Sequence, residues 1–476
     1  MRFTGRDRDL ALLRAQLDGI TSGLGATRGR AVLVTGRRRV GKSRVVQEFV
    51  ARSGVPSIVF QATWGRLAAA ERADFVTTVA TSGLPEADLI AGTRPDDWSQ
   101  ALRALAAVLP ADRPVIVVID EVPWLTQGDP EFEGALQTVW DRHLSDRPVL
   151  LLLIGSNQSV MARLTDHDRP FLGRASVMRV QPLNPADVAD ATGLEPADAL
   201  DAWLVTGGFP QIVASWQAGE SRAHFLTRSL AEPLSPLLVS GELTLLGEDA
   251  PAATSRAVLE AVGVGERTFT AIARAAGGGV TRLASGALTP LLRSLTDAGA
   301  LASDLPLSTA PDTKNRRYRI ADPYLRFWLA FGPMAVPLAD RGLGHLAYQR
   351  VEASWSSWRG RAVEPLVRES LQRLLMAQRG EAVAIGGWWN RQNNPEIDLV
   401  VADKAPVARR VHWLGSVKWH DSAPFDRHDF DALVRGAPVV PGATGAGLVA
   451  VSRTGVVPGL PLHRVWGPDD LVATWR

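Results

Sequence analysis

The fold of the first part of the chain is decided by the stretch Ala31-Val32-Leu33-Val34-Thr35-Gly36-Arg37-Arg38-Arg39-Val40-Gly41-Lys42-Ser43-Arg44. It places the pattern GxxxxGKS between an apolar run typical of a buried strand and a helix-like segment. Glycines let backbone N–H groups surround a triphosphate, and the N-terminus of the following helix adds positive potential. The sequence therefore predicts a nucleotide-binding loop at residues 36–43.

The residue types of this Walker A loop predict which groups hold the nucleotide. The ammonium of Lys42 is expected to reach the outer phosphates, and the hydroxyl of Ser43 is expected to bind Mg²⁺. The residues expected to contact the nucleotide are Gly36, Arg37, Arg38, Arg39, Val40, Gly41, Lys42, Ser43 and Arg44. ATP and Mg²⁺ are the predicted cofactors.

A second apolar run, residues 115–119, ends in Asp120 and Glu121, as expected for a strand that carries a Walker B motif. Asp120 is expected to hold Mg²⁺, and Glu121 to polarise the attacking water. Two acids after a strand can also form an ordinary polar loop, but the upstream Walker A loop favours the nucleotide interpretation. The two motifs together predict hydrolysis of ATP.

Strand-like runs alternate with helix-like stretches over the first 180 residues, which predicts an α/β core with a parallel sheet. The runs are 31–35, 57–60, 115–119 and 149–154. Ser156 and Asn157 follow the last of these strands, at the end where such sheets bind ligands. Either side chain is expected to orient the attacking water, and the alternative is a polar turn that caps the next helix.

Composition limits the remaining possibilities. A chain of 476 residues is long enough for about three domains, so the nucleotide-binding core leaves much of it unexplained. The net charge of +2 gives no general attraction to nucleic acid. The sequence has no cysteine, which excludes disulfides and cysteine-based metal sites. Without an apolar signal core or a run of about 18 apolar residues, we expect a cytoplasmic protein with no membrane partner.

Several motifs together resemble the archaeal-type ATPases of the AAA+/STAND group of P-loop proteins. They are Phe3-Thr4-Gly5-Arg6, the Walker A and Walker B motifs, Phe171-Leu172-Gly173-Arg174 and Gly207-Gly208-Phe209-Pro210. The resemblance implies a helical lid around the last motif and a catalytic contact between Arg174 and phosphate. The alternative for Arg174 is a surface arginine. Assembly into a homo-oligomer is left open.

Residues 251–322 are similar to a winged helix. Two short helical segments precede a third in which leucines recur on one face, and two strand-like runs follow around a polar tip. The segments are 254–262, 268–276, 284–299, 301–307 and 316–320, and the basic residues near the tip are Lys314, Arg316, Arg317 and Arg319. These cations are expected to contact double-stranded DNA. The alternative is a module that docks inside the protein.

Residues 321–328 resemble the segment that joins the winged helix to the last domain in the same ATPase group, so the resemblance covers nearly the whole chain. The last domain resembles the PD-(D/E)xK nuclease fold through Glu364 on a helix, Asp398 at the start of a strand and Lys418 at the end of another. In that fold the acids bind a divalent metal, and the lysine polarises water or steadies the phosphate. Ser416 stands where the second acid belongs, which removes a charge that Mg²⁺ needs.

Lysine is rare in this chain, because only Lys42, Lys314, Lys404 and Lys418 occur among its 52 basic residues. The retention of Lys418 therefore favours a chemical use, and Asp421 or Glu396 is a candidate for the missing metal ligand. Against this, the serine favours a folded remnant that binds nucleic acid or only packs. We expect the remnant and keep the active nuclease as the alternative.

The expected organisation has five parts: a P-loop ATPase core (1–183), a helical lid (184–250), a winged helix (251–322), a linker (323–350) and a C-terminal α/β restriction-endonuclease-like domain (351–476). The expected function is that of an ATP-hydrolysing molecular switch. Two alternatives stay open, namely an ATP-gated DNA or RNA nuclease of a defence system and a DNA-binding transcriptional regulator.

Overall fold

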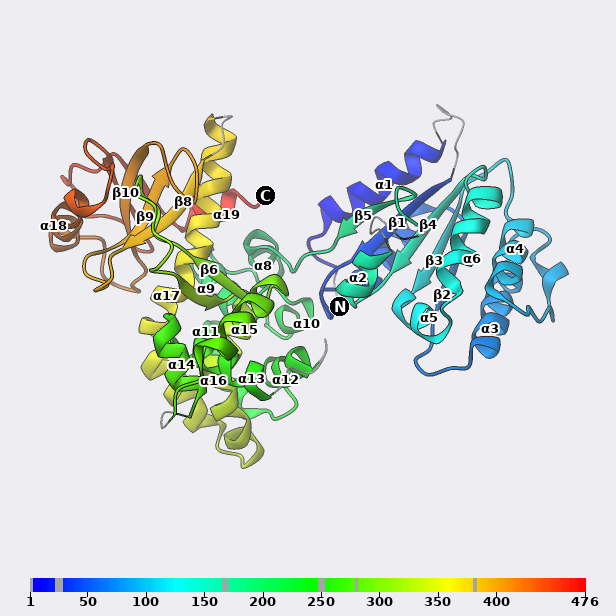
Figure 1. Cartoon of the computed structure of the whole chain (residues 1–476), viewed down its shortest axis with the longest axis horizontal. Helices are drawn as coiled ribbons and strands as arrows, with labels where there is room; N and C mark the ends of the chain where they lie inside the picture. Colours follow the sequence, from blue (N-terminus) through cyan, green and yellow to red (C-terminus); the bar gives the residue numbers. More distant parts are fainter. Residues whose placement is uncertain are drawn as a thin grey trace. The chain divides into compact units, whose positions relative to one another are not determined.

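The computed structural model describes residues 3–21, 29–164, 169, 171–246, 253–278, 281–379 and 383–476. The chain forms two compact units (Figure 1). The first spans Arg6–Pro182, and the second spans Leu183–Arg476 together with the described residues before Arg6. The expected boundary between residues 250 and 251 lies outside the described residues.

The first unit is built on a five-stranded parallel sheet with the order β2-β3-β4-β1-β5. The strands are β1 (Arg30–Thr35), β2 (Ser57–Gln61), β3 (Val115–Asp120), β4 (Val149–Ile154) and β5 (Ala175–Arg179). Every residue of β3 and β4 is buried, as expected for central strands of a parallel sheet. The predicted α/β core is confirmed. Strand β5 was not predicted from the sequence, and three of its five residues are exposed.

Helices cover this sheet (Figure 1). They are α1 (Asp7–Thr21), α2 (Lys42–Ser53), α3 (Ala68–Ala80), η1 (Ala87–Ile90), α4 (Trp98–Val108), α5 (Val122–Gly128), α6 (Phe132–Val139), η2 (Trp140–Leu144) and α7 (Gln158–Arg163). Phe75, Trp98 and Phe132 bring α3, α4 and α6 together in edge-to-face contacts, with ring centroids 5.6 and 5.0 Å apart. Leu33 of β1 belongs to the same core, so these helices cover one face of the sheet.

Helices make up the first part of the second unit: α8 (Pro185–Thr192), α9 (Pro196–Thr206), α10 (Pro210–Val213), α11 (Arg222–Ala231) and α12 (Pro236–Leu246). The two glycines of the Gly-Gly-x-Pro motif lie between α9 and α10. Gly207 and Gly208 have φ angles of 59° and 69°, which favour glycine. A Cβ atom at Gly208 would lie 1.9 Å from the carbonyl oxygen of Leu183. The motif therefore allows a turn packed directly on backbone.

Three helices and a two-stranded antiparallel ribbon follow: α13 (Ala253–Val264), α14 (Phe269–Ala276), α15 (Ser285–Asp297), β6 (Leu301–Asp304) and β7 (Arg317–Ile320). The predicted helices and strands are present here. Leu288 and Leu292, two of the leucines predicted to share a face, are buried. Helix α16 (Pro323–Asp340) continues from the ribbon.

The chain ends in a mixed α/β arrangement. Its elements are α17 (Gly344–Arg379), β8 (Ala384–Trp389), β9 (Glu396–Ala402), β10 (Val411–Lys418), α18 (Arg427–Gly436), η3 (Ala437–Val439), β11 (Gly447–Ser452), β12 (Arg464–Trp466) and α19 (Pro468–Ala473). Strands β8, β9 and β10 pair antiparallel, whereas β11 and β12 continue the sheet in parallel. The predicted C-terminal α/β fold is confirmed as a helix, three antiparallel strands, a crossover helix and parallel strands.

A buried network of charges fastens α9 to this mixed sheet. The side chain of Arg359 on α17 is only 1% exposed, and it pairs with Asp201 at 2.8 Å and with Asp421 at 2.7 Å. Arg359 also donates to the carbonyl oxygen of Trp419 at 2.9 Å, and the indole of Trp419 donates to Asp201 at 3.0 Å. Burial raises the pKa of Asp201, and the arginines oppose that shift. Because Arg359 and Asp201 are paired with each other, both side chains can stay charged in the interior.

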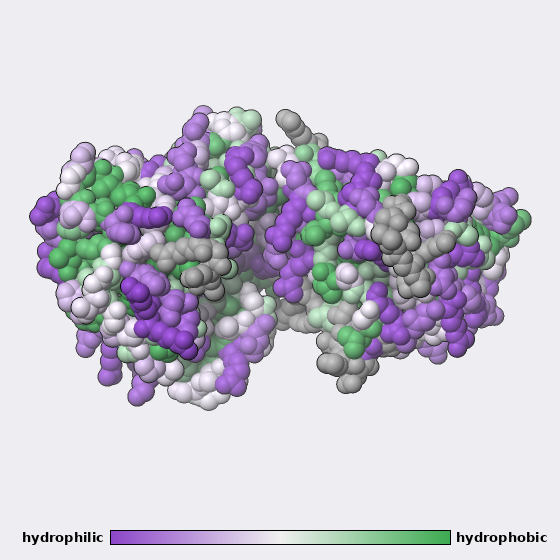
Figure 2. Space-filling model, turned by 90° about the horizontal axis from the view of Figure 1, so that it is seen from above, coloured by the Kyte–Doolittle hydropathy of each residue, from purple (hydrophilic) through white to green (hydrophobic). Residues whose placement is uncertain are grey.

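The surface alternates in polarity. On the face seen in Figure 2, hydrophobic residues are interspersed with hydrophilic ones. Within the described ranges, no helix combines the length and the apolar character that a membrane crossing requires.

Candidate functional site

The topology of the first unit brings the predicted nucleotide motifs to one edge of the sheet. Strand β4 lies between β3 and β1, and all three run parallel. Their carboxyl ends are therefore neighbours, and ligands bind at that edge in open α/β sheets. Residues 36–43 follow β1, Asp120 and Glu121 stand at the end of β3, and Ser156 follows β4.

The backbone of the loop after β1 needs its glycines. The φ angles of Gly36, Arg39 and Gly41 are 147°, 66° and 90°. A Cβ atom at Gly36 would lie 2.4 Å from the carbonyl oxygen of Val180, so no other residue fits there without displacing the backbone. The loop then enters α2, whose first residue is Lys42.

The ammonium of Lys42 lies within this loop. Its Nζ donates to the carbonyl oxygens of Gly36 at 2.9 Å and Arg37 at 3.0 Å, and the side chain is buried. Among the other predicted contact residues, Val40 is buried, Ser43 is partly buried, and Arg38, Arg39 and Arg44 are exposed. The lysine is thus held where a phosphate cradled by the loop would meet it.

Arg6 supports the loop, a role that we did not assign from the sequence. Its guanidinium donates to the carbonyl oxygens of Val40 and Gln181, and it pairs with Asp9 at 3.2 Å. Arg6 is only 9% exposed. The motif Phe3-Thr4-Gly5-Arg6 was the available signal, but sequence spacing cannot show that this arginine reaches a loop more than thirty residues later.

The two acids after β3 have different environments. Asp120 is 8% exposed, and its Oδ1 accepts the N–H of Glu121 at 2.9 Å. Glu121 has a φ angle of 57°, and its carboxylate accepts the Ser156 hydroxyl at 3.2 and 3.4 Å. Asp120 and Ser43 line one cavity of about 170 Å³. A hydroxyl and a carboxylate around one cavity fit Mg²⁺, which prefers oxygen ligands.

Asn157 caps a helix in this structure. Its Oδ1 accepts the N–H of Val160 at 3.1 Å and so caps α7, which was the alternative interpretation. The polar side chain that contacts Glu121 is that of Ser156. Adjacent residues after a strand point in different directions, so the sequence could not decide between the two.

Arg174 lies at the opposite end of the sheet from the nucleotide loop, where strands β1 and β5 begin. It immediately precedes β5, whose first residue, Ala175, pairs with Ala31 near the beginning of β1. Arg174 forms a two-pronged ion pair with Asp141 at 2.7 and 2.8 Å, and this contact holds the pKa of Asp141 below its ordinary value. The structure therefore does not bring Arg174 to the nucleotide loop of its own chain, contrary to the simplest form of the prediction.

The nuclease-like residues of the second unit are paired with other protein groups. Arg368 donates to the Glu364 carboxylate at 3.0 Å and to the carbonyl oxygen of Asp398 at 3.0 Å. Burial raises the pKa of Glu364 to about 7, with Arg368 opposing. A guanidinium therefore lies beside Glu364, while burial favours the protonated form of its carboxyl group.

The predicted nuclease strands are paired through Ser416. Its hydroxyl and the N–H of Val417 both donate to Asp398 Oδ2 at 2.8 Å, whereas burial raises the pKa of Asp398. Lys418 points to a different partner, because its Nζ is 2.9 Å from Asp429 on α18. The described residues contain no group of three or more histidine, aspartate or glutamate side chains arranged to hold a metal.

Neither proposed replacement for the missing acid is available. Asp421 belongs to the buried network of Arg359. Glu396 pairs with Arg317 through both carboxylate oxygens and lies 3.9 Å from Arg267. Both candidate replacements are therefore engaged with arginines in this structure.

The ribbon arginines are engaged within the second unit. Arg317, predicted to contact DNA, is only 6% exposed; it pairs with Glu396 and stacks on the ring of Trp389 at 4.1 Å. That placement contradicts its predicted DNA contact, because it is buried against β8 and β9. Arg319 pairs with Asp304 at 3.1 Å. Lys314 and Arg316 remain exposed at the tip.

Comparisons with known proteins agree with the motifs of the first unit. Residues 2–154 match the family model described as "AAA ATPase domain", and residues 328–429 match one described as "Archaea bacterial proteins of unknown function". An uncharacterised protein of Methanocaldococcus jannaschii is 22% identical over 420 residues, which cover 86% of this chain and 87% of that protein.

Two solved structures are similar over most of their own length. A Walker-type ATPase of Pyrococcus abyssi has 18% identity and a TM-score of 0.49, covering 69% of this chain and 96% of that one. The ORC2 protein of Aeropyrum pernix, in its ADPNP–ADP complexes, has 13% identity and a TM-score of 0.44, covering 74% and 96%. The first part of this chain, residues 2–154, is thus similar to AAA ATPase domains, in agreement with the site geometry.

Proposed function

We propose that the chain binds ATP with Mg²⁺ at residues 36–43, hydrolyses it, and uses the nucleotide state as a molecular switch. The observation that carries the proposal is the convergence of Lys42, Ser43, Asp120 and Glu121 on one edge of the sheet, with Ser43 and Asp120 around one cavity. Lys42 suits phosphate, Ser43 and Asp120 suit Mg²⁺, and Glu121 suits the attacking water.

Each side chain of the proposed site has a separate role in ATP binding and hydrolysis. Lys42 exchanges its bonds to the loop carbonyls for bonds to the outer phosphates. Ser43 and Asp120 hold Mg²⁺, which neutralises charge on the phosphate oxygens when it is bound. Glu121 accepts a hydrogen bond from the attacking water, and Ser156 fixes the carboxylate for that task. Arg6 keeps the loop in place through Val40.

The test of nucleotide binding is Lys42→Ala, measured by calorimetric titration of ATP with Mg²⁺. We expect affinity to fall by about a hundredfold or more, because the outer phosphates lose a charge-assisted bond. Lys404→Ala is the matched control, since that lysine is exposed in the C-terminal domain. Equal affinities of the two variants at the level of the parent would overturn the assignment.

We propose further that Arg174 acts on a nucleotide held by a neighbouring copy in a homo-oligomer. Its position at the amino end of β5, whereas the loop follows the carboxyl end of β1, supports this proposal. A mixture of Arg174→Ala chains with Lys42→Ala chains should hydrolyse ATP faster than either variant alone. Asp141→Asn controls for the lost ion pair. A mixture no more active than the sum of its parts would place Arg174 in a structural role.

We propose that the C-terminal domain is a nuclease-like remnant and that the segment 253–320 is a winged helix docked internally. The absence of a metal-binding cluster among the described residues supports the first statement, and the buried contact of Arg317 with Glu396 supports the second. Charge reversal of the exposed Lys314 and Arg316 should leave the salt dependence of any duplex binding unchanged. A flatter salt dependence would instead favour the DNA-binding regulator.

A further inference from the structure

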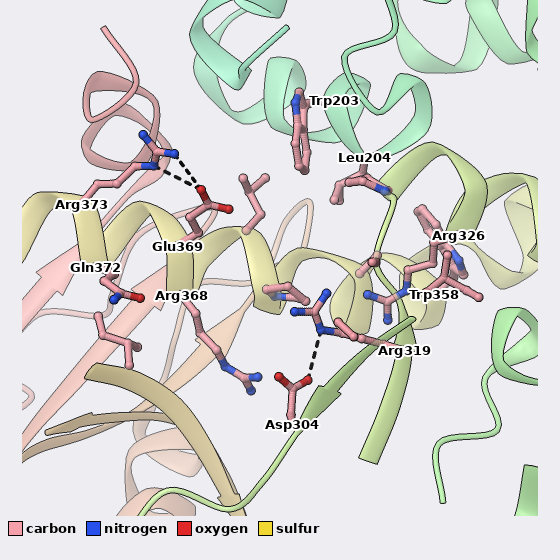
Figure 3. Close-up of a pocket in the computed structure, with 18 of the residues that line it drawn as sticks. Trp203, Leu204, Asp304, Arg319, Arg326, Trp358, Arg368, Glu369, Gln372 and Arg373 are labelled. Carbon is pink, nitrogen blue, oxygen red and sulfur yellow. Dashed lines mark hydrogen bonds and ion pairs between the residues drawn. The ribbon is translucent and has the colours of Figure 1, made fainter. Parts of the chain in front are cut away.

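The second unit contains a pocket of about 640 Å³ where α9, the β6–β7 ribbon, α16, α17 and β8 meet (Figure 3). Its volume falls within the range of small-molecule sites. The side chains that the argument uses are Trp203, Arg319, Arg326, Trp358, Arg368 and Arg373, all of which line the pocket. Nothing in the ATPase mechanism uses this pocket.

Positive charge in the pocket is only partly compensated. Arg319 is paired with Asp304 at 3.1 Å, and Arg373 with Glu369 at 2.8 Å, as the dashed lines of Figure 3 show. Arg326 is different, because within the described part of the chain it has no carboxylate in hydrogen-bond contact. Its guanidinium donates instead to the carbonyl oxygen of a neighbouring arginine on α17, at 3.0 Å.

The electrostatic environment of Arg326 is unfavourable in the absence of an anion. Burial lowers its pKa to about 10 with the help of Arg319, Arg361 and Arg267, whereas Glu364 opposes the shift. Removing a cation from water without a paired anion is costly. An anion in the pocket would relieve that cost, and a guanidinium suits phosphate because it offers parallel N–H donors.

Aromatic surface lies beside these cations. Trp203 projects from α9 into the pocket in Figure 3, and its indole N–H is anchored on the carbonyl oxygen of Leu183 at 3.0 Å. The anchoring fixes the ring so that it can serve as a stacking surface. Trp358 lines the same pocket from α17. A flat aromatic surface next to guanidinium groups is the combination with which proteins hold a base and its phosphate.

We propose that this pocket binds a nucleoside phosphate of mononucleotide size, with phosphate at Arg326 and the base against Trp203. The site is separate in the sequence from the Walker A loop and goes beyond the proposed ATPase function. Its ligand contacts α9, the ribbon and α17 together. Binding therefore fixes these elements against one another and stabilises the second unit.

The experiment uses the full chain carrying Lys42→Ala, which removes the Walker A site. AMP, ADP and inorganic phosphate are titrated by calorimetry, and melting temperature is followed in parallel. We expect a remaining site that binds AMP more tightly than phosphate. Adding Arg326→Gln should weaken AMP binding by about tenfold or more, because the amide can still bond the carbonyl oxygen on α17 but carries no charge.

Further variants separate the base from the phosphate and folding from binding. Trp203→Leu should weaken AMP binding while leaving phosphate binding unchanged. Arg326→Lys keeps the charge without the parallel N–H donors and should bind AMP more tightly than Arg326→Gln, which guards against a folding defect in Arg326→Gln. Arg350→Gln is the control, because Arg350 is exposed on the same helix α17 outside the pocket.

Three outcomes would overturn the proposal: no AMP binding by the Lys42→Ala chain, equal AMP affinity with and without Arg326→Gln, or tighter binding of a single-stranded oligonucleotide than of AMP. Failure of the ATPase assignment has a different signature. In that case the Lys42→Ala chain would bind ATP as the parent does, and Arg326→Gln would leave that ATP binding intact.

Discussion

At the scale of single residues, Glu121 and its donor Ser156 define the catalytic expectation. Glu121→Gln should keep ATP binding but lower turnover by about a hundredfold or more, since the amide fills the space without accepting the water proton as a carboxylate does. Phosphate release under saturating ATP is the measurement. Turnover at the parent rate would transfer the water-positioning role to another side chain.

Ser156 and Asn157 give a second prediction at this scale. Ser156→Ala should lower turnover by about tenfold, because the Glu121 carboxylate loses its hydroxyl donor. Asn157→Ala should cost about 1 kcal/mol of stability through the lost helix cap, with a smaller effect on turnover. Phosphate release and melting temperature, measured on both variants, distinguish the two roles. The reverse order of effects would restore Asn157 as the catalytic residue.

Glu364 predicts a pH dependence of stability. Its pKa rises from 4.5 to about 7 in the folded chain, so the folded state holds this proton more tightly than the unfolded state does. The associated stability is complete below pH 4.5 and is lost as pH rises through 7, by about 3 kcal/mol. Glu364→Gln mimics the protonated form. Its melting temperature relative to the parent should therefore be higher at pH 8 than at pH 5, and an equal difference at both pH values would contradict the shift.

At the scale of elements, Ser416 joins β10 to β9 through Asp398. We expect no cleavage of DNA or RNA by the parent with Mg²⁺ or Mn²⁺, with or without ATP, and no catalytic effect of Asp398→Ala.

Ser416→Glu should lower the melting temperature, because it replaces a donor to Asp398 with a second negative charge. Mn²⁺ should recover part of that loss if the carboxylates can share a metal.

Ser416→Glu alone should not produce a nuclease, because Glu364 is paired with Arg368 and Lys418 is paired with Asp429. The control is Ser416→Gln, which changes the size of the side chain without the charge. Cleavage by the parent that disappears in Asp398→Ala would contradict this prediction. The active nuclease would then become the leading function of the C-terminal domain.

At the scale of the whole molecule, the second unit depends on the network around Arg359. Arg359→Ala leaves Asp201 buried without its main partner, and we expect a loss of about 3–5 kcal/mol. Arg350→Ala on the same helix is the control. Thermal unfolding followed by tryptophan fluorescence measures both. A melting temperature equal to that of the control would show that α9 and the mixed sheet are held together mainly by apolar contacts.

The sequence by itself determined the parallel core and the position of the nucleotide loop, and it predicted that the C-terminal metal site is lost. These conclusions rest on local properties: buried parallel strands are apolar throughout, a loop around phosphate needs glycines and a lysine at fixed spacing, and a serine cannot supply the charge of an acid. The order of helices and strands between residues 253 and 320 also followed from periodicity.

Only the tertiary structure decided which polar side chains meet. Arg6 reaches Val40, Ser156 rather than Asn157 contacts Glu121, and Arg317 is buried against Glu396. These choices depend on strand order, on the direction of single side chains and on contacts between distant segments. Charge in the sequence could not separate a cation exposed to DNA from one paired in the interior, because burial is a property of the folded chain.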